Sequence, residues 1–209
     1  MSVYKISYFN AKAKGELSRL LLSAAGKEFE DERFNDETWP INKAKMPLGQ
    51  VPVLTVDGQQ IPQSGAIQRY LAREFGLYGK NSMENTECDV ILETIEQEVQ
   101  TEMTKYYYAG VRNEQEKKAE IKRNLMVNVY PKFLNFMDKI LKKNGTGYLV
   151  GSELTVADLA YFNVQDKLKS ETGEECPAIN DYPELLKLIE TVKSVPNVRR
   201  WLEKRPETA

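Results

Sequence analysis

The chain contains no histidine, so no imidazole side chain is available for chemistry. Without histidine, the Ser-His and Cys-His nucleophile pairs and the imidazole ligands of metal sites are ruled out. The two cysteines, Cys88 and Cys176, lie far apart and form no Cys-x-x-Cys motif, so we expect ordinary thiols. Acid-base chemistry must therefore come from tyrosine, lysine, aspartate or glutamate.

Tyr8 is the first candidate, because it ends a predicted strand. Residues 3–8 are β-prone and aromatic, and Tyr4, Ile6 and Tyr8 alternate onto one face. A phenol at the end of a strand can reach a ligand in the adjoining loop. A tyrosine in this position is more often a core residue with a satisfied hydroxyl, so its role depends on its neighbours.

Two short segments, Val51-Pro52 and Gln63-Ser64, flank an Asp-Gly turn. A cis Val51–Pro52 bond would turn the backbone N–H and C=O of Val51 outward to pair with an extended peptide, although a trans bond is commoner. Ser64, at a helix start, offers its hydroxyl and backbone N–H groups to a carboxylate, or simply caps the helix. Gln63 could recognise a second carboxylate or an amine.

Trp39 and Lys43, four residues apart in WPINK, add an indole donor and a cation. Taken together, these groups describe a site for a small peptide. Val51 would supply backbone pairing, Ser64 and Lys43 would anchor carboxylates, and the phenol would lie near the centre of the peptide.

The elements that must position these residues follow from hydrophobic period and turn signals. An Asp-Gly pair between two β-prone segments favours a type I′ hairpin. The predicted order is βαβ and then ββα: a strand at 3–8, a helix from Glu16 to Gly26, a weak strand at 28–34, strands at 53–56 and 59–61 joined by Asp57-Gly58, and a helix from Ser64 to Gly76.

Beyond residue 77 the pattern becomes almost entirely helical. We therefore expect an N-terminal domain at 1–76, a linker at 77–83 and a helical domain at 84–209. The predicted helices include one near 84–109, one near 114–142 with a kink at Pro131, and two that begin at Pro183 and Pro196. Thr155-Val-Ala-Asp158 has the form of a capping box, which we interpret as a folding signal rather than a chemical one.

The bulk properties exclude several classes of protein. In 209 residues, 31 acidic side chains nearly balance 29 basic ones, so the net charge gives no reason to expect nucleic acid or a membrane surface as partner. No apolar run is long enough to span a bilayer, and the start lacks the layout of a signal peptide. We expect a soluble, cytoplasmic protein.

The chain resembles the cytosolic glutathione S-transferases, most closely the sigma class, which includes haematopoietic-type prostaglandin D synthases and invertebrate enzymes. The resemblance covers essentially the whole chain and is carried by YKISYFN, FEDERF…WPINKAKMPLGQVPVL, DGQQIPQSGAIQRYLAREFGL, LTVADL and PNVRRWLEKRP. It implies an α/β thioredoxin-like N-terminal domain that holds glutathione, an all-α C-terminal domain and a homodimer. It further implies that glutathione is a co-substrate, that no cofactor is permanently bound, and that a small apolar electrophile is the other substrate.

The resemblance also assigns residues by position. Tyr8 is similar to the catalytic tyrosine, whose hydroxyl donates to the glutathione sulfur and favours the thiolate. The remaining glutathione contacts within one chain would be Lys14, Trp39, Lys43, Gln50, Val51, Pro52, Gln63 and Ser64. Glu96 of the partner subunit would add one more contact. The electrophile pocket would begin at Phe9 and include Met103, Tyr106 and Tyr107 of the Tyr106-Tyr107-Tyr108 run, although these tyrosines could equally be packing or surface residues.

The chain departs from the sigma pattern at two places. Lys14 stands where many sigma-class enzymes carry arginine, and it keeps the charge but loses the multi-donor fork. Gln97 follows Glu96 where the family usually has acidic residues, so we expect no activating metal ion.

These departures favour general conjugation or detoxification over prostaglandin D synthesis, which stays an alternative. A non-catalytic, crystallin-like or ligand-binding descendant is the other alternative. Such crystallins tend to be rich in methionine with degraded glutathione contacts, whereas this chain has six methionines and retains Tyr8, Gln63 and Ser64.

Overall fold

The structure, a computed structural model, describes residues 2–208. It divides into two compact units. One comprises the residues up to Tyr78 together with those from Lys193 onward, and the other comprises Gly79–Val192. By compactness, the end of the chain thus belongs with the N-terminal unit, whereas the sequence placed it in the helical domain. The domain limits 1–76, 77–83 and 84–209 stay a prediction.

The N-terminal unit is built on a mixed four-stranded sheet in the order β2-β1-β3-β4. β1 pairs in parallel with β2 and antiparallel with β3, and β3 pairs antiparallel with β4. The βαβ-ββα order predicted for a thioredoxin-like domain is confirmed. Its elements are β1 (Tyr4–Phe9), α1 (Glu16–Ala24), β2 (Phe29–Phe34), α2 (Trp39–Lys43), β3 (Val53–Val56), β4 (Gln59–Pro62) and α3 (Ser64–Glu74).

The turn between β3 and β4 has the predicted type I′ character. Asp57 and Gly58 have φ angles of +49° and +89°, and a type I′ turn requires positive φ at both central residues. The Asp57 carboxylate also accepts the N–H of Val3 at 2.8 Å. This bond ties the hairpin to the start of β1, which fixes the register of the central strands.

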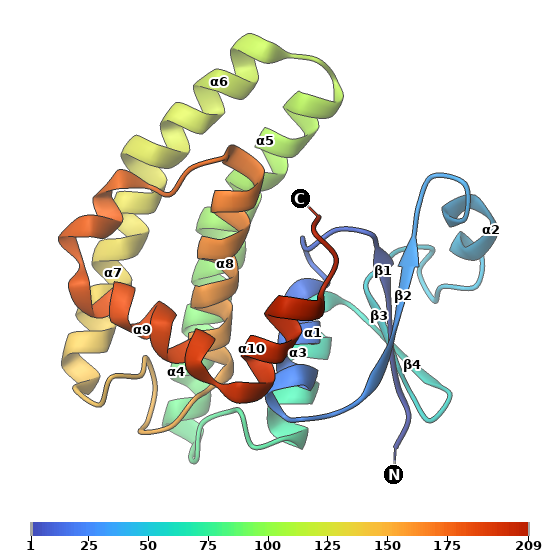
Figure 1. Cartoon of the computed structure of the whole chain (residues 1–209), viewed down its shortest axis with the longest axis horizontal. Coiled ribbons are helices and arrows are strands. Elements are labelled where there is room, and N and C mark those ends of the chain that lie inside the picture. The colour runs from blue at the N-terminus through green and yellow to red at the C-terminus, as the bar shows by residue number, and fades with distance from the viewer. Residues whose placement is uncertain (1, 209) are drawn as a thin grey trace. The chain divides into compact units, whose positions relative to one another are not determined.

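The core of this unit lies between the sheet and its helices. Ile6, Leu20, Leu54, Ile67 and Leu71 are fully buried and come from β1, α1, β3 and α3. Helices α1 and α3 lie on one side of the sheet with α10 (Pro196–Lys204), and α2 lies on the other side (Figure 1). The apolar stripe that predicted a helix from Glu16 is therefore the face of α1 that meets this core.

The second unit is helical, and no strand occurs in its described residues. The helices predicted near 84–109 and 114–142 and the one that begins at Pro183 are found here, and a further helix begins at the predicted capping box. The helix predicted from Pro196 is α10 of the N-terminal unit, and the structure adds a 3₁₀ segment, η3, that the sequence did not indicate. The elements are α4 (Ser82–Thr94), η1 (Ile95–Gln100), α5 (Thr101–Val111), α6 (Gln115–Asn124), η2 (Leu125–Val129), α7 (Tyr130–Asn144), α8 (Val156–Thr172), η3 (Pro177–Asp181) and α9 (Pro183–Ser194).

The two longest predicted helices pass through π-helical segments, η1 and η2. Pro131 lies in the first turn of α7, directly after η2. Proline has no N–H to bond the preceding turn, and we expected a kink there. The wider π-helical turn before Pro131 accommodates the missing hydrogen bond. η1 contains no proline, and nothing in its sequence IEQEVQ marks it as a π segment.

The capping box at Thr155 starts α8 as predicted. The Asp158 carboxylate accepts the backbone N–H of Thr155 at 2.8 Å and that of Leu149 at 2.8 Å. It also accepts the Thr155 hydroxyl at 3.0 Å. Asp158 is fully buried, and burial raises its pKa to about 6. The motif therefore joins the loop at Leu149 to the helix start.

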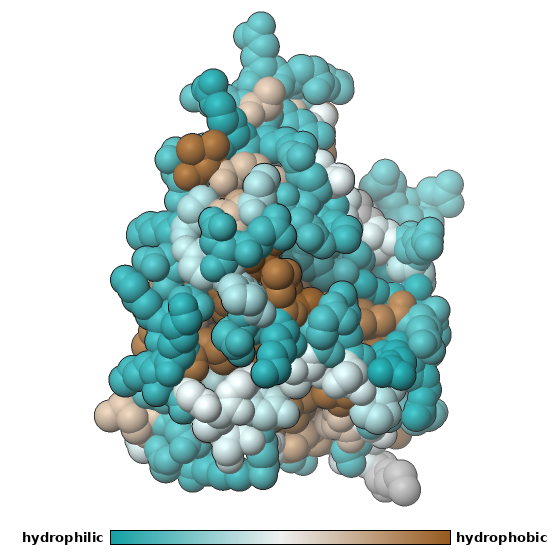
Figure 2. Space-filling view, turned by 60° about the vertical axis from the view of Figure 1, so that its left-hand side comes forward, coloured by the Kyte–Doolittle hydropathy of each residue, from teal (hydrophilic) through white to brown (hydrophobic). Residues whose placement is uncertain are grey.

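Both cysteines are free and buried, as expected for ordinary thiols. Burial raises the pKa of Cys88 to about 12 and also raises that of Cys176. In Figure 2, hydrophilic residues cover most of the visible face and hydrophobic ones form small patches. None of the helices among residues 2–208 has the length and apolar character needed to cross a membrane.

Candidate active site

The strand register gathers the candidate residues of the N-terminal unit at one end of its sheet. Ser7 of β1 pairs with Val53 of β3, and Val53 pairs with Pro62 of β4. The next residues along each strand are Tyr8, Pro52 and Gln63. The residues that the sequence singled out on either side of the Asp-Gly turn therefore meet beside the end of β1, and the hairpin is the device that brings them together.

Tyr8 is buried, and its hydroxyl oxygen accepts the backbone N–H of Lys14 at 3.2 Å. A phenol oxygen that accepts a hydrogen bond still has its own O–H to donate, and an accepted bond strengthens that donor. The Lys14 side chain is exposed. The main-chain contact of Lys14 was not predicted, because the sequence suggested only a charge.

The segment between Tyr8 and α1 encloses the tyrosine ring closely. A Cβ atom at Gly15 would lie 2.6 Å from Cδ1 of Tyr8, a distance that real side chains do not adopt. Gly15 is therefore required by close approach, although the sequence analysis gave it no role. The guanidinium of Arg19 lies 5.8 Å from the centre of the Tyr8 ring.

Phe9, Trp39 and Val51 lie around one apolar cluster, whose buried members are Phe34, Met46 and Val53. The rings of Phe9 and Trp39 are 5.1 Å apart in an edge-to-face arrangement. Three residues assigned separately from the sequence thus pack on one apolar cluster, each of them half-buried.

The residues between α2 and β3 extend this region. Lys43 and Gln50 are exposed, and the Lys43 side chain passes close to the position that a Cβ of Gly49 would occupy, with Cε at 3.6 Å. The Val51–Pro52 peptide bond is cis. Val51 lies two residues before β3, outside the sheet ladder.

The start of α3 differs from the prediction by one residue. Ser64 was expected to cap the helix, but Ser64 is its first residue and Gln63 is the N-cap. Gln63 adopts φ of +73°, which is unfavourable for a residue with a side chain and costs about 1–3 kcal/mol. Sequence alone does not fix a helix start to one residue, because both positions lack an intrahelical N–H partner.

The first turn of α3 contains no acidic residue. The backbone N–H groups there and the positive end of the helix dipole favour an anion. Gln63 is exposed and Ser64 is half-buried, so both side chains can reach a ligand at this helix start.

Four candidates lie in the helical unit. Glu96 is half-buried within η1, and Tyr107 of α5 is exposed. Met103 and Tyr106 are buried, and the Met103 sulfur accepts the hydroxyl of Tyr130 at 3.6 Å. Met103 is thus a core residue of this unit. The roles assigned to these four residues stay predictions.

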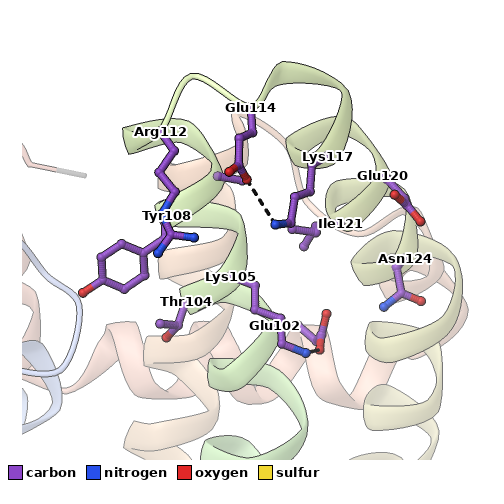
Figure 3. A pocket seen from close by; sticks show the side chains of 11 residues that line it. Glu102, Thr104, Lys105, Tyr108, Arg112, Glu114, Lys117, Glu120, Ile121 and Asn124 are labelled. Carbon is purple, nitrogen blue, oxygen red and sulfur yellow. Dashed lines mark hydrogen bonds and ion pairs between the residues drawn. The ribbon is translucent and has the colours of Figure 1, made fainter.

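A cavity of about 540 Å³ lies between α5 and α6. Tyr108, the last of the three consecutive tyrosines, lines it together with Arg112, and the Glu114–Lys117 ion pair, 3.1 Å long, lies on its α6 side at the start of that helix (Figure 3). Met103, Tyr106 and Tyr107 are not among the lining residues. Of the three consecutive tyrosines, Tyr108 is the one among the residues that line this cavity.

Among residues 2–208, no group of three or more cysteine, aspartate or glutamate side chains is arranged to hold a metal ion. The groups gathered in the N-terminal unit are a phenol, a helix start and exposed polar side chains. This combination suits the binding of a small, partly anionic molecule and hydrogen-bond donation to it.

Comparison with known proteins identifies the family. The glutathione S-transferase N-terminal domain matches residues 5–73, and the glutathione S-transferase C-terminal domain matches residues 97–205. Glutathione S-transferase 1 of Ascaris suum is 36% identical over 100% of this chain and 99% of its own. The hematopoietic prostaglandin D synthase of Gallus gallus is 34% identical over the full length of both chains.

A solved structure agrees with this match. The crystal structure described as a monomeric glutathione S-transferase of the hookworm Necator americanus has 33% identity, a TM-score of 0.88 and coverage of 98% of both chains. The chain belongs to the glutathione S-transferase family of enzymes, which use glutathione as co-substrate. Both the predicted family and the predicted two-part fold are confirmed.

Proposed function

We propose that this chain is a sigma-class glutathione transferase in which Tyr8 activates the glutathione thiol. The observation that carries the proposal is the register that places Tyr8, Val51-Pro52 and Gln63-Ser64 at one end of the sheet. These elements offer a phenol, a strand-like backbone edge and an anion-binding helix start within one region. A tripeptide with a central thiol and carboxylates at its ends fits such a set.

In this proposal, the Tyr8 O–H donates to the sulfur of bound glutathione. The thiol proton leaves to solvent and Tyr8 keeps its own proton. A free thiol has a pKa of about 8.5, and lowering it by about two units needs roughly 2.7 kcal/mol of thiolate stabilisation. A charge-assisted hydrogen bond supplies about 1.5–3 kcal/mol, and the N–H of Lys14 on the same oxygen strengthens it.

The thiolate then attacks an electrophilic carbon of a small apolar substrate. With an aryl halide, a C–S bond forms and the halide leaves with the bonding electron pair. The Tyr106-Tyr107-Tyr108 run, Met103 and Phe9 stay our candidates for contact with this substrate. The aromatic cluster of Phe9 and Trp39 supplies an apolar wall near the phenol.

Glutathione would be held at both ends. Gln63 and Ser64 would bind the γ-glutamyl carboxylate and amine at the start of α3, and Trp39 and Lys43 the glycine end. Gln50, Val51 and Pro52 would flank the cysteinyl residue, with the backbone of Val51 pairing as a strand would. Lys14 would contribute charge near the phenol.

The test is a conjugation assay with a chromogenic aryl halide on the wild type and on Tyr8→Phe. Tyr8→Phe should lower kcat/KM by about 10²-fold, the loss expected for one oriented hydrogen-bond donor to a developing charge. The matched control is Tyr4→Phe, on the same strand and face and equally buried. Equal activity of the Tyr8→Phe and Tyr4→Phe proteins, or no turnover by the wild type, would refute the proposal.

The glycine-end contact has its own test. Trp39 and Trp201 are the two tryptophans of the chain. Glutathione should change the fluorescence of the wild type, and the change should disappear in Trp39→Phe. A change of the same size in both proteins would exclude Trp39 from the site.

We further propose a cytoplasmic homodimer in which Glu96 of each chain approaches the glutathione amino group held by the other. Because one relative of known structure is described as monomeric, the oligomeric state needs measurement. Light scattering at micromolar concentration should give twice the 24.0 kDa mass of the chain. A monomer that conjugates glutathione at full rate would rule out the shared site.

Prostaglandin D synthesis is the second candidate, favoured by the 34% identity to the chicken enzyme over the whole chain. It requires the same thiolate and a pocket for a fatty-acid chain. Lys14 in place of arginine leads us to favour conjugation of small electrophiles. Incubation with prostaglandin H and glutathione, with product analysis by mass spectrometry, separates the two activities.

A further inference from the structure

A group of charged side chains lies inside the N-terminal unit, directly behind the segment that follows Tyr8. The Arg19 side chain has no exposed surface, and that of Glu16 is 1% exposed. Burying two ions costs several kcal/mol each unless their hydrogen-bonding groups are satisfied. The groups that satisfy this buried ion pair are therefore needed for its stability.

Arg19 binds this segment to strand β2. Its Nε donates to Asp31 of β2 at 2.8 Å, and its Nη1 donates to the carbonyl of Ala11 at 2.8 Å. Its Nη2 donates to the carbonyl of Phe9 at 3.4 Å. Arg19 thus fixes two carbonyls within the three residues after Tyr8 while its guanidinium lies over the Tyr8 ring.

Glu16 joins Arg19 to the last helix. Its Oε2 lies 3.3 Å from Nη1 of Arg19. Its Oε1 accepts the indole N–H of Trp201 at 2.9 Å and Nη1 of Arg205 at 2.8 Å. Helices α1 and α10 pack together in the same unit (Figure 1). The end of the chain is thereby connected to the Tyr8 segment through two ion pairs.

The segment from Phe9 to Gly15 determines the environment of the Tyr8 hydroxyl. The N–H of Lys14 reaches that oxygen at 3.2 Å, and Gly15 leaves no spare room against the ring. A shift of about 1 Å in this segment would misdirect the O–H, and a misplacement of that size can cost about 10²-fold in rate. Contacts that hold this segment therefore bear on the chemistry.

We propose that Glu16, Arg19, Trp201 and Arg205 are positioning residues for the Tyr8 hydroxyl. They act through the Phe9 and Ala11 carbonyls and the backbone of Lys14, and they touch no reacting atom. The strength of thiolate stabilisation at Tyr8 thus depends on the C-terminal helix. This inference rests on the proposed function, because it concerns how well Tyr8 performs its assigned role.

The test uses Arg205, which is only partly buried and can be changed with the least damage to the core. Arg205→Gln removes the charge, Arg205→Lys retains it, and Arg200→Gln is the control, an exposed arginine of α10, the helix that Arg205 directly follows. The readouts are the pKa of enzyme-bound glutathione, followed by thiolate absorbance, and the separate values of kcat and KM.

Arg205→Gln should raise the pKa of bound glutathione by about one unit, equivalent to tenfold less thiolate below that pKa. We expect kcat to fall by about threefold at pH 7 and by about tenfold below pH 6, while KM for glutathione stays within about twofold. Arg205→Lys should restore most of kcat, and Arg200→Gln should match the wild type. A network that only stabilised the fold would lower the denaturation midpoint and leave the thiolate pKa and kcat unchanged, and that result overturns the inference.

If Arg205→Gln does not fold, Trp201→Phe replaces it, because it removes one donor to Glu16 and keeps the ion pair. It should shift the thiolate pKa in the same direction by a smaller amount, and an unchanged pKa overturns the inference. The proposed function fails separately: in that case the wild type itself forms no thiolate at neutral pH.

Discussion

Replacing Asp158 with alanine should destabilise the helical unit, and more strongly at pH 5 than at pH 7. The Asp158 carboxylate accepts two buried backbone N–H groups, from Leu149 and Thr155, each at 2.8 Å. Alanine leaves both donors without an acceptor. Each unsatisfied buried donor costs about 1–3 kcal/mol, so we expect a loss of about 3 kcal/mol at pH 7.

The pH dependence follows from the pKa of Asp158, which burial raises from 3.8 to about 6. Between these values the folded protein holds a proton that the unfolded chain has lost. The stability contributed by Asp158 therefore falls as the pH rises through this window and levels off above it. With these two pKa values, the contribution is about 1.4 kcal/mol larger at pH 5 than at pH 7.

The assay is urea unfolding at both pH values, followed by far-ultraviolet circular dichroism. Tryptophan fluorescence is unsuitable, because Trp39 and Trp201 both lie in the N-terminal unit. The control is Asn81→Ala, which removes an exposed, uncharged cap that accepts the N–H groups of Met83 and Glu84 at 3.0 Å. It should cost about 1 kcal/mol at either pH.

The reasoning is refuted if Asp158→Ala costs the same at pH 5 and pH 7. It is also refuted if the cost is greater at pH 7. Either result would mean that the hydrogen bonds outweigh burial and keep the carboxyl ionised throughout this range. The capping box would then be an anionic cap, whose value rises with pH.

Two further substitutions and one labelling experiment probe other features. Gly15→Ala should reduce conjugation by at least about tenfold without loss of helical dichroism, because its Cβ would lie 2.6 Å from the Tyr8 ring; full activity would contradict the close approach. Gln63→Gly should raise the free energy of unfolding by about 1 kcal/mol by relieving a φ of +73°, and calorimetry should show weaker glutathione binding; a lower melting temperature would argue against strain there. Cys88 should react with a disulfide reagent at pH 8 only after unfolding, because burial raises its pKa to about 12; prompt labelling of the native thiol would contradict this.

The sequence was most informative where a short pattern determines local geometry. Asp57-Gly58 predicted a turn that needs two positive φ angles, and Thr155 with Asp158 predicted a capping box; both are confirmed. These signals are strong because few other residues satisfy the same backbone requirement.

The parts that were missed depend on contacts between distant residues. Arg19 lies on the side of α1 opposite the apolar stripe, where the pattern predicts exposure, and it is buried there because it pairs with Glu16 and Asp31. Tyr8 could be identified as a candidate, whereas the N–H of Lys14 on its oxygen could not, because a main-chain contact leaves no trace in residue type. The start of α3 was misplaced by one residue for the same reason, since Gln63 and Ser64 are both compatible with a helix start.

The packing of α10 against α1 bears on the order in which this protein folds during translation. Trp201 and Glu16 are separated by 185 residues along the chain, and Arg205 lies further on. During synthesis the strands and first helices emerge early, and local pairing can begin at once. The buried carboxylate of Glu16 must wait for its indole and guanidinium until Trp201 and Arg205 leave the exit tunnel, so the nascent sheet carries an unfinished polar core while the helical unit is synthesised.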